Sequence, residues 1–406
     1  MHAIHDFTAK LRQPSLAPQF EAYLAWRRAL GAARGRGEPD PAPPDLAPIS
    51  INLDLTTACN FKCTHCVDWD MLNSKDKYQE GELKDGLRLM QQRGLRSVIL
   101  IGGGEPTLYP RFAEFVRFLK ELELQVAIVS NGSRGHVLLE AVPPLDERDW
   151  IRLSLDSGSN ELFVKMHRPA DPKIDLDAIC ARIPEIKRAN PRVRVGFSYI
   201  ITWNGASRDG NEILENVHEI EMAAERARNS GFDYIAFKPV LERQPDGAEV
   251  MDPERAKSDL AAMLLRIRGE IDKARAFADD TFEVYESSNL RMLESGSWRE
   301  MTRQPRTCHM QALRQVVSPL GLYNCPAHRG VAKARIAGPS AYKDEATAAQ
   351  TGQQLLEILD QFDASHECRE VTCLYNGVNW WIEKLVANPD QSFESEIGEE
   401  RLDWFL

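Results

Sequence analysis

Residues 49–66 read ISINLDLTTACNFKCTHC, and this stretch decides how the rest of the chain is interpreted. Its first half alternates apolar and polar residues from Ile49 to Leu55, which is the period of a β-strand. Its second half carries thiols at Cys59, Cys63 and Cys66. The pattern therefore predicts a strand that runs directly into a cysteine loop.

The three thiols are spaced at i, i+4 and i+7. A short loop with this spacing can point three sulfurs at one 4Fe-4S cubane and leave its fourth iron without a protein ligand. Such an open iron can chelate the amino and carboxylate groups of S-adenosylmethionine (SAM) and pass one electron to its sulfonium. From the spacing alone, a zinc site with His65 as the fourth ligand and a set of ordinary buried thiols also stay open.

Apolar strand candidates and amphipathic stretches alternate after the cysteine loop. We expect strands at 97–101, 125–130, 151–156, 194–203 and 234–239, and helices at 81–93, 111–122, 176–189 and 211–230. This alternation predicts the α/β class with parallel pairing. With the first strand it gives six units, a partial (β/α)6 barrel, in which functional residues gather at the carboxyl ends of the strands.

Changes of pattern divide the chain into five parts. We expect a helical arm (20–30) with a Pro/Gly linker over 1–48, the partial barrel over 49–245, and a helical connector over 246–300. A hairpin-plus-helix domain follows over 301–387, with a hairpin from 315–318 and 322–325 and helices at 347–362 and 378–387. Residues 388–406 are expected to be a solvated acidic tail, with docking of its apolar end at 404–406 as the alternative.

Composition excludes several classes of function. The formal charge of -11 argues against a surface built for nucleic acid. The apolar runs are too short for a membrane span, and the first residues lack the features of a secretory signal. We therefore expect a cytoplasmic protein without nucleic-acid or membrane partners, whose clustered cysteines bind metal or do redox chemistry rather than form disulfides.

A second motif, Gly102-Gly103-Gly104-Glu105-Pro106, follows the second predicted strand. It lacks the spacing and the Lys-Ser/Thr of a phosphate-binding loop. Together with Cys-x3-Cys-x2-Cys it resembles the radical SAM superfamily, and the resemblance covers about residues 49–239. It implies that Gly103, Gly104 and Glu105 line the methionyl amine of SAM. It also implies further cofactor-binding residues: His65 against the adenine, Arg168 on the carboxylate, and Ser130, Asn131, Ser154 and Asp156 at the strand ends.

The remaining cysteines form a second pattern at Cys308, Cys325, Cys368 and Cys373. Four thiols can close a cubane completely, and a structural zinc site is the alternative. The pattern resembles the twitch extension, the short form of the SPASM extension of radical SAM enzymes, and this implies one auxiliary 4Fe-4S cluster. Cys180 is left over as a core residue.

The resemblance implies an oxidoreductase that cleaves SAM to a 5'-deoxyadenosyl radical and removes hydrogen from a small metabolite or peptide. We expect a two-electron oxidation, with the auxiliary cluster as electron acceptor and a flavodoxin or ferredoxin as donor. Candidate catalytic residues are Lys238, His309 and Tyr323. The alternatives are a non-catalytic iron-sulfur electron carrier or redox sensor, and an epimerase, bond-forming or group-transfer enzyme. A molybdopterin-precursor synthase is disfavoured, because those proteins end in Gly-Gly and this sequence ends in Phe405-Leu406.

Overall fold

The computed structural model describes residues 6–244, 247–251, 253–255 and 259–406. The chain forms two compact units. Unit 1 combines residues 1–52, 76–98 and 299–406, and unit 2 combines residues 53–75 and 99–298. The N-terminal arm therefore belongs to the same unit as the C-terminal hairpin and helices.

Unit 2 is built on a parallel sheet. Only the carboxyl ends of β1 (Ser50–Leu53) and β2 (Ser97–Leu100) belong to this unit. The other strands of the sheet are β3 (Gln125–Ser130), β4 (Trp150–Ser154), β5 (Arg194–Ile201), β8 (Tyr234–Pro239) and β11 (Glu283–Glu286). The strand order is β11-β8-β5-β4-β3-β2-β1, and the pairs from β3 to β11 are parallel. The predicted α/β class with a partial barrel is confirmed.

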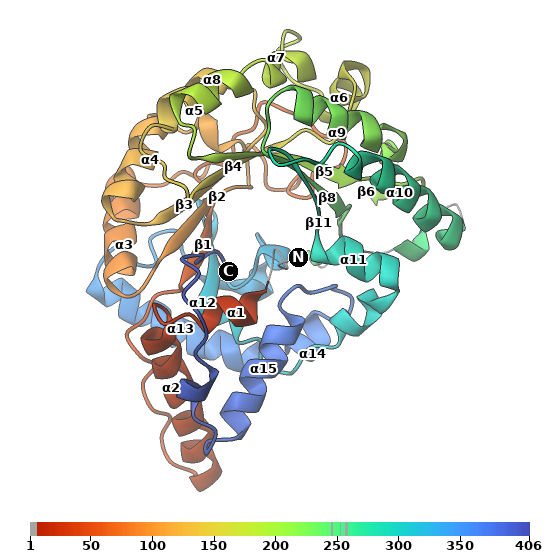
Figure 1. The fold of residues 1–406 in the computed structure, drawn as a ribbon. Coiled ribbons are helices and arrows are strands. Elements are labelled where there is room, and N and C mark those ends of the chain that lie inside the picture. The colour runs from red at the N-terminus through yellow and green to blue at the C-terminus, as the bar shows by residue number, and fades with distance from the viewer. Residues whose placement is uncertain (1–5, 245–246, 252, 256–258) are drawn as a thin grey trace. The chain divides into compact units, whose positions relative to one another are not determined.

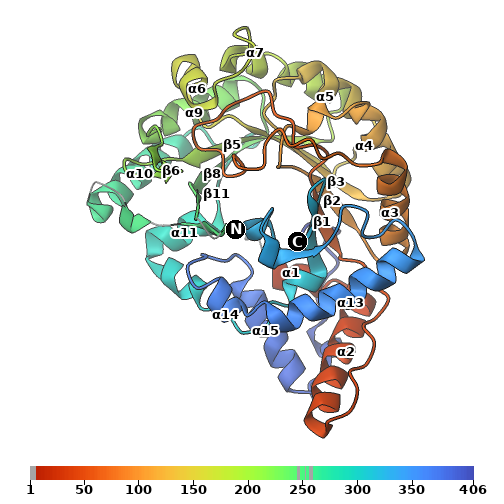
Figure 2. The ribbon, with the colours of Figure 1, turned by 180° about the vertical axis from the view of Figure 1, so that it is seen from behind.

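Helices cover the convex side of this arc of strands (Figures 1 and 2). They are α4 (Phe112–Glu121), α5 (Gly135–Ala141), α6 (Asn160–His167), α7 (Leu176–Cys180), α8 (Ile183–Ala189), α9 (Ile220–Asn229) and α10 (Leu260–Arg275). The strand residues beneath them are apolar and buried, as Phe197 and Phe237 illustrate. Burial of these alternate side chains fixes which face of each strand points outward.

Three predicted elements of unit 2 are wrong in detail. The helix at 176–189 is split into α7 and α8, because Pro184 cannot donate the hydrogen bond that would join them. The helix at 211–230 begins only at Ile220. Its first part is extended instead, and Asn216 accepts a hydrogen bond from the Thr202 amide and donates to the Ile200 carbonyl. The strand β11 lies within residues predicted to be helical.

Unit 1 packs helices around a short antiparallel sheet. Its elements are α1 (Phe7–Leu11), α2 (Ala17–Arg36), α3 (Glu80–Gln92), α12 (Met310–Leu313), β12 (Arg314–Ser318), β13 (Gly321–Tyr323), β14 (Arg335–Ala337), α13 (Glu345–Gln361), α14 (Ala364–Glu367) and α15 (Asn376–Ala387). The predicted hairpin is confirmed by the antiparallel pair β12–β13. Phe20 of α2 stacks on Trp381 of α15 at 5.3 Å within the core of this unit.

Helix α2 is longer than predicted. It continues through Gly35 to Arg36 and ends at Gly37, which has φ 70°. Glycine adopts this left-handed conformation without strain and so ends helices frequently. The linker without regular structure therefore begins two residues later than Gly35 suggested.

The C-terminal residues contradict the expectation of a solvated tail. Lys10 forms an ion pair with Asp403 at 3.0 Å and donates to the Phe405 carbonyl at 2.6 Å. Trp404 donates to Ser15, and Leu406 is only 1% exposed. The apolar end of the acidic stretch is therefore docked within unit 1.

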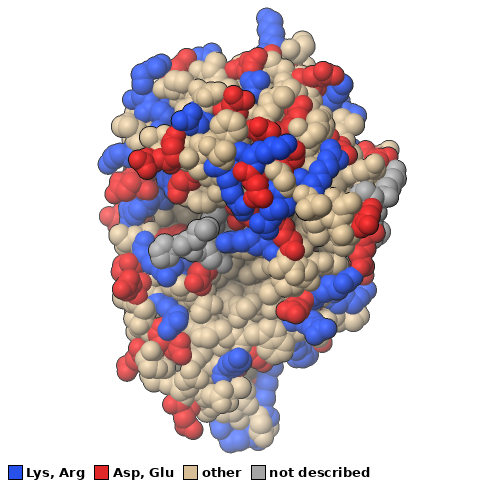
Figure 3. All heavy atoms as spheres, turned by 45° about the vertical axis from the view of Figure 1, so that its right-hand side comes forward, with Lys and Arg blue, Asp and Glu red and all other residues tan. Residues whose placement is uncertain are grey.

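Acidic and basic side chains are interspersed over the face drawn in Figure 3. Within the described ranges, no helix is both long and apolar enough to cross a bilayer.

Candidate functional site

The cysteine loop of unit 2 is tied to the end of α6 by its backbone. The Thr64 amide donates to the Met166 carbonyl at 2.7 Å, and the Ala170 amide donates to the Asn60 carbonyl at 2.9 Å. Phe61, on the same loop, is 1% exposed and forms a β-bridge with Pro169. These contacts fix the path of the loop on both sides of Cys63.

The three sulfurs of this loop lie within one another's electrostatic reach. Burial raises the pKa of Cys63 well above its ordinary value, and the neighbouring Cys66 and Cys59 raise it further. Burial also raises the pKa of Cys66 to about 12. Buried thiols gather in this way where a positive centre can stabilise their thiolates.

The zinc alternative for this loop would use His65 as the fourth ligand beside the three sulfurs. The Nε2 atom of His65 lies 3.0 Å from Asp156. A 4Fe-4S cluster at this loop stays a prediction.

Glu105 lies at the centre of a buried hydrogen-bond network beside the loop. Its Oε1 accepts hydrogen bonds from the hydroxyls of Ser130 (2.7 Å) and Thr107 (2.6 Å), and its Oε2 accepts one from the Asn131 amide (2.7 Å). Burial raises the pKa of Glu105, although these hydrogen bonds oppose the change. A cationic ammonium group would offset the burial of this carboxylate.

Gly104 brings this network against the cysteine loop. A Cβ atom at Gly104 would lie 2.4 Å from the Ala58 carbonyl oxygen, and the Glu105 amide donates to that same oxygen at 2.8 Å. Asn131 also donates to the Asn60 side chain at 3.0 Å. The structure thus places Gly104, Glu105 and Asn131 against residues 58–60 of the cysteine loop. Contact of Gly103, Gly104, Glu105, Ser130 and Asn131 with SAM stays a prediction.

A second network joins His65, Asp156 and His167 beneath the loop. Asp156 has φ 51°, accepts a hydrogen bond from the Ile200 amide at 2.6 Å, and faces both histidines. His167 Nδ1 lies 3.3 Å from Cys63 Sγ, and its Nε2 lies 2.9 Å from the Leu155 carbonyl. The sequence carried no signal for His167 beyond its place next to Arg168.

The other predicted residues of unit 2 lie around these networks. Ser154 ends β4, and Arg168 is exposed at the end of α6 with φ 46°. The Arg168 carbonyl accepts from the Lys62 amide, so this residue borders the cysteine loop. Lys238 on β8 lies 3.4 Å from the Ser198 hydroxyl. Contacts of Ser154, Asp156, Arg168 and His65 with SAM, and a catalytic role for Lys238, stay predictions.

Four of the five remaining cysteines gather in unit 1. Burial raises the pKa of Cys368 well above its ordinary value, and Cys373, Cys325 and Cys308 add to the increase in that order. An auxiliary 4Fe-4S cluster at these four sulfurs stays a prediction, with a structural zinc site as the alternative. Cys180 is buried in α7 of unit 2, as predicted for a core residue.

Polar side chains of unit 1 surround these four sulfurs. His328 Nε2 lies 3.5 Å from Cys368 Sγ, and the Asn379 amide lies 3.5 Å from Cys308 Sγ. His309 is fully buried, with its nitrogens 2.6 Å from Glu383 and 2.8 Å from the Tyr23 hydroxyl. The Tyr323 hydroxyl donates to the Leu320 carbonyl at 3.3 Å. Catalytic roles for His309 and Tyr323 stay predictions.

Comparison with known proteins agrees with this site. Residues 53–217 match the Radical SAM superfamily. An S-adenosylmethionine-dependent nucleotide dehydratase from the Thermoplasmatales archaeon (strain ISO4-H5) is 33% identical over 112 residues, which are 27% of this chain and 38% of that protein. Mycofactocin maturase MftC from Mycobacterium tuberculosis (strain CDC 1551 / Oshkosh) is 34% identical over 126 residues, 29% of each chain. The chain thus spans about a third of the length of these two relatives.

The fold is also similar to that of a solved protein. The crystal structure of Streptococcus suis SuiB aligns with a TM-score of 0.53 at 14% identity, over 75% of this chain and 66% of that one. Further structures hold SuiB bound to S-adenosylmethionine and to the precursor peptide SuiA.

Proposed function

Because residues 53–217 match the Radical SAM superfamily, we propose that Cys59, Cys63 and Cys66 hold a 4Fe-4S cluster with which the chain cleaves SAM reductively. The observation that carries this proposal is the close packing of Gly104 and Glu105 against the cysteine loop. It places a buried carboxylate for the SAM ammonium beside three gathered thiols. When bound, the cluster and SAM supply a carbon radical that abstracts hydrogen from the substrate.

The residues of the chain bind and orient these groups. Ser130, Thr107 and the Asn131 amide hold the Glu105 carboxylate in one position, so that it needs no rearrangement to accept an ammonium. Arg168, at the border of the loop, offers a guanidinium for the SAM carboxylate. His167 Nδ1 lies 3.3 Å from Cys63 Sγ and would support that sulfur as a ligand.

Cys308, Cys325, Cys368 and Cys373 would hold an auxiliary 4Fe-4S cluster in unit 1. The gathering of the four thiols, three of which raise the pKa of Cys368, supports this assignment. Such a cluster has no open iron and can accept an electron from a substrate radical, so the proposed outcome is a two-electron oxidation. A flavodoxin or ferredoxin would supply the electron that starts the reaction. The proposed catalytic residues are His309, Tyr323 and Lys238, with His309 and Tyr323 as the ones that would move a proton.

The relatives suggest two kinds of substrate. One has a name that specifies a nucleotide, and SuiB has been solved with a precursor peptide. We therefore propose a small metabolite or a peptide as the substrate of this chain.

Anaerobic reconstitution of the wild type and of Cys59→Ala tests the proposal. The wild type should bind about eight irons and release 5'-deoxyadenosine when reduced with SAM, whereas Cys59→Ala should release none. Cys325→Ala should lose about four irons and keep SAM cleavage. A reduced, iron-loaded wild type that leaves SAM intact would overturn the proposal in favour of a non-catalytic electron carrier.

A further inference from the structure

The concave side of the unit 2 sheet carries polar side chains on three neighbouring strands, with Arg152 level with Gly196 and Tyr234 and Lys238 four residues further along β8. Parallel pairing places Ser154 opposite Ser198, and Lys238 opposite Ile200. Arg152 lies two residues before Ser154 and therefore shares its face. The alternate residues of these strands are apolar and buried beneath the helices, so this polar set points to the other side.

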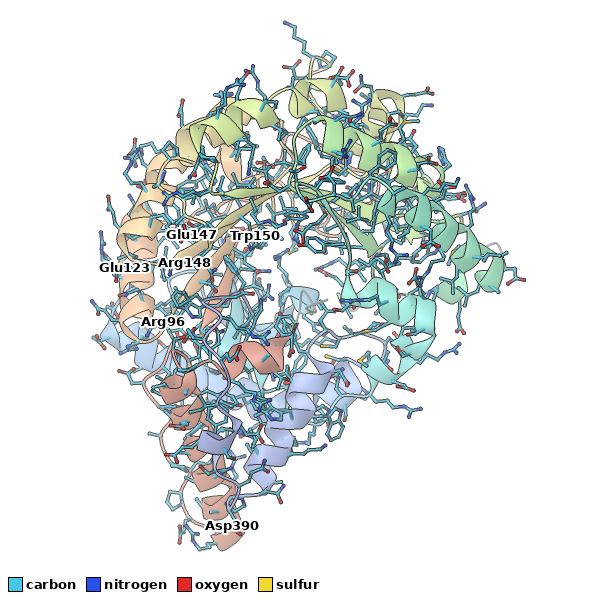
Figure 4. All side chains as sticks on the ribbon, in the orientation of Figure 1. Arg96, Glu123, Glu147, Arg148, Trp150 and Asp390 are labelled. Carbon is cyan, nitrogen blue, oxygen red and sulfur yellow. The ribbon has the colours of Figure 1, made fainter. Side chains whose placement is uncertain are left out.

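Arg152 extends along this face without a carboxylate partner. Its guanidinium carbon lies 5.0 Å from the ring centre of Trp150, which Figure 4 labels on β4. The ring of Tyr234 crosses the neighbouring Gly196, where a Cβ would come within 2.1 Å of it. The Nε of Arg152 is buried and has no hydrogen-bond partner in the described part of the chain.

Lys238 is the second cation of this face. Its one hydrogen bond to the described residues is the long contact with Ser198 Oγ at 3.4 Å. Asp156 is the acidic group that favours its charge, and that carboxylate is already bound to His65 and the Ile200 amide. Neither Arg152 nor Lys238 has a carboxylate oxygen within 4.0 Å among residues that the structure describes.

A third cation on the same face shows the contrast. Arg194, on β5, forms an ion pair with Glu283 and lies near the hydroxyl of Tyr285 at 3.4 Å. It is also about half exposed, so water screens its charge. The sheet therefore pairs its cation at the start of β5 and leaves Arg152 and Lys238 unpaired.

Burial makes the absence of partners costly. It lowers the pKa of Arg152, and it lowers that of Lys238 well below its ordinary value. Buried charges are usually paired, because an isolated one loses its hydration without compensation. The two cations lie close enough that the charge of Arg152 lowers the pKa of Lys238 further, so an anion near both would offset their repulsion.

We propose that Arg152 and Lys238 together bind an anionic group, a carboxylate or a phosphate, of the substrate on the concave side of the sheet. The inference rests on the proposed function only in assigning the anion to the substrate. It narrows the substrate class to organic acids, phosphorylated metabolites, or peptides that present a carboxylate. The Ser198 and Ser154 hydroxyls stand beside the two cations as additional donors.

The test measures binding of inorganic phosphate and of acetate to the full-length, iron-loaded chain by calorimetry, with SAM at saturation. We expect Arg152→Gln and Lys238→Met each to weaken binding of the preferred anion about tenfold or more, because each removes a charge-assisted hydrogen bond. Arg194→Gln, which removes the paired cation, should change it less than about twofold. The preference between the two probes distinguishes a phosphate from a carboxylate site.

Charge-conserving variants show whether a loss of binding comes from the lost charge or from a loss of folding. Arg152→Lys and Lys238→Arg should retain most of the binding that the neutral variants lose. The proposal is overturned if the wild type binds neither anion, if Arg194→Gln weakens binding as much as Arg152→Gln, or if the neutral variants weaken SAM instead, since the cations would then serve the cofactor. Cys59→Ala should still bind the anion, so failure of SAM cleavage and failure of this site give different results.

Discussion

Replacing Gly104 by alanine should disturb the cysteine loop more than its small size suggests. The new Cβ would lie 2.4 Å from the Ala58 oxygen, 2.6 Å from the Thr57 carbonyl carbon and 2.7 Å from the Thr56 oxygen. All three are backbone atoms, so no side chain can rotate away. Overpacking of this kind costs ~1–3 kcal/mol, and loss of the Glu105 to Ala58 hydrogen bond adds ~1 kcal/mol.

We therefore expect Gly104→Ala to lower the free energy of unfolding by ~2–4 kcal/mol and to reduce iron bound at Cys59. Urea denaturation of the iron-free chain and iron analysis after reconstitution measure the two effects. Gly269→Ala is the matched control, because a Cβ there meets nothing within 4 Å on the exposed side of α10. It should stabilise the chain by up to ~1 kcal/mol. If the Gly104→Ala chain had the free energy of unfolding and the iron content of the wild type, the close packing of Gly104 against the backbone of residues 56–58 would be refuted.

Three further changes test other parts of the structure. Cys180→Ser should keep the iron content and SAM cleavage of the wild type, because the Cys180 thiol is buried beside Ser230 rather than beside another cysteine; a loss of iron would contradict its assignment to the core. Gly196→Ala should lower the free energy of unfolding by ~2–3 kcal/mol in urea, because its Cβ would overlap the Tyr234 ring, and an unchanged midpoint would contradict this. Asp146→Asn should cost ~1 kcal/mol at about pH 7. Burial alone would raise the pKa of Asp146, but hydrogen bonds from Arg148 and Lys120 lower it below its ordinary value. Its contribution is therefore present above the unfolded pKa of about 4 and should vanish as the pH falls through the lowered value, which denaturation at a series of pH values would show.

The sequence predicted the parallel core because strands buried on one face carry a strong signal. The predicted strands at 125–130 and 234–239 match β3 and β8 residue for residue. β11 was not predicted, because its sequence Glu283-Val284-Tyr285-Glu286 has too few apolar residues to be distinguished from the helices on either side. β11 pairs with β8, and this tertiary contact cannot be predicted from the local sequence pattern.

The candidate site was predictable where chemistry depends on short spacing. The cysteines and Gly103, Gly104 and Glu105 are each defined within a few residues of sequence. His167 and Arg152 were not, because their importance comes from neighbours on other strands and loops. The same limit applies to the docked C-terminal residues, whose partner Lys10 lies far away in sequence.

The backbone hydrogen bonds between residues 60–64 and the end of α6 affect how the protein can be prepared. In a zinc finger the metal supplies the folding energy, and the apoprotein is unstructured. Here the loop already has its shape from main-chain contacts, so loading with iron need not be a folding event. We therefore expect the iron-free protein to be folded and able to take up iron when it is reconstituted anaerobically after purification.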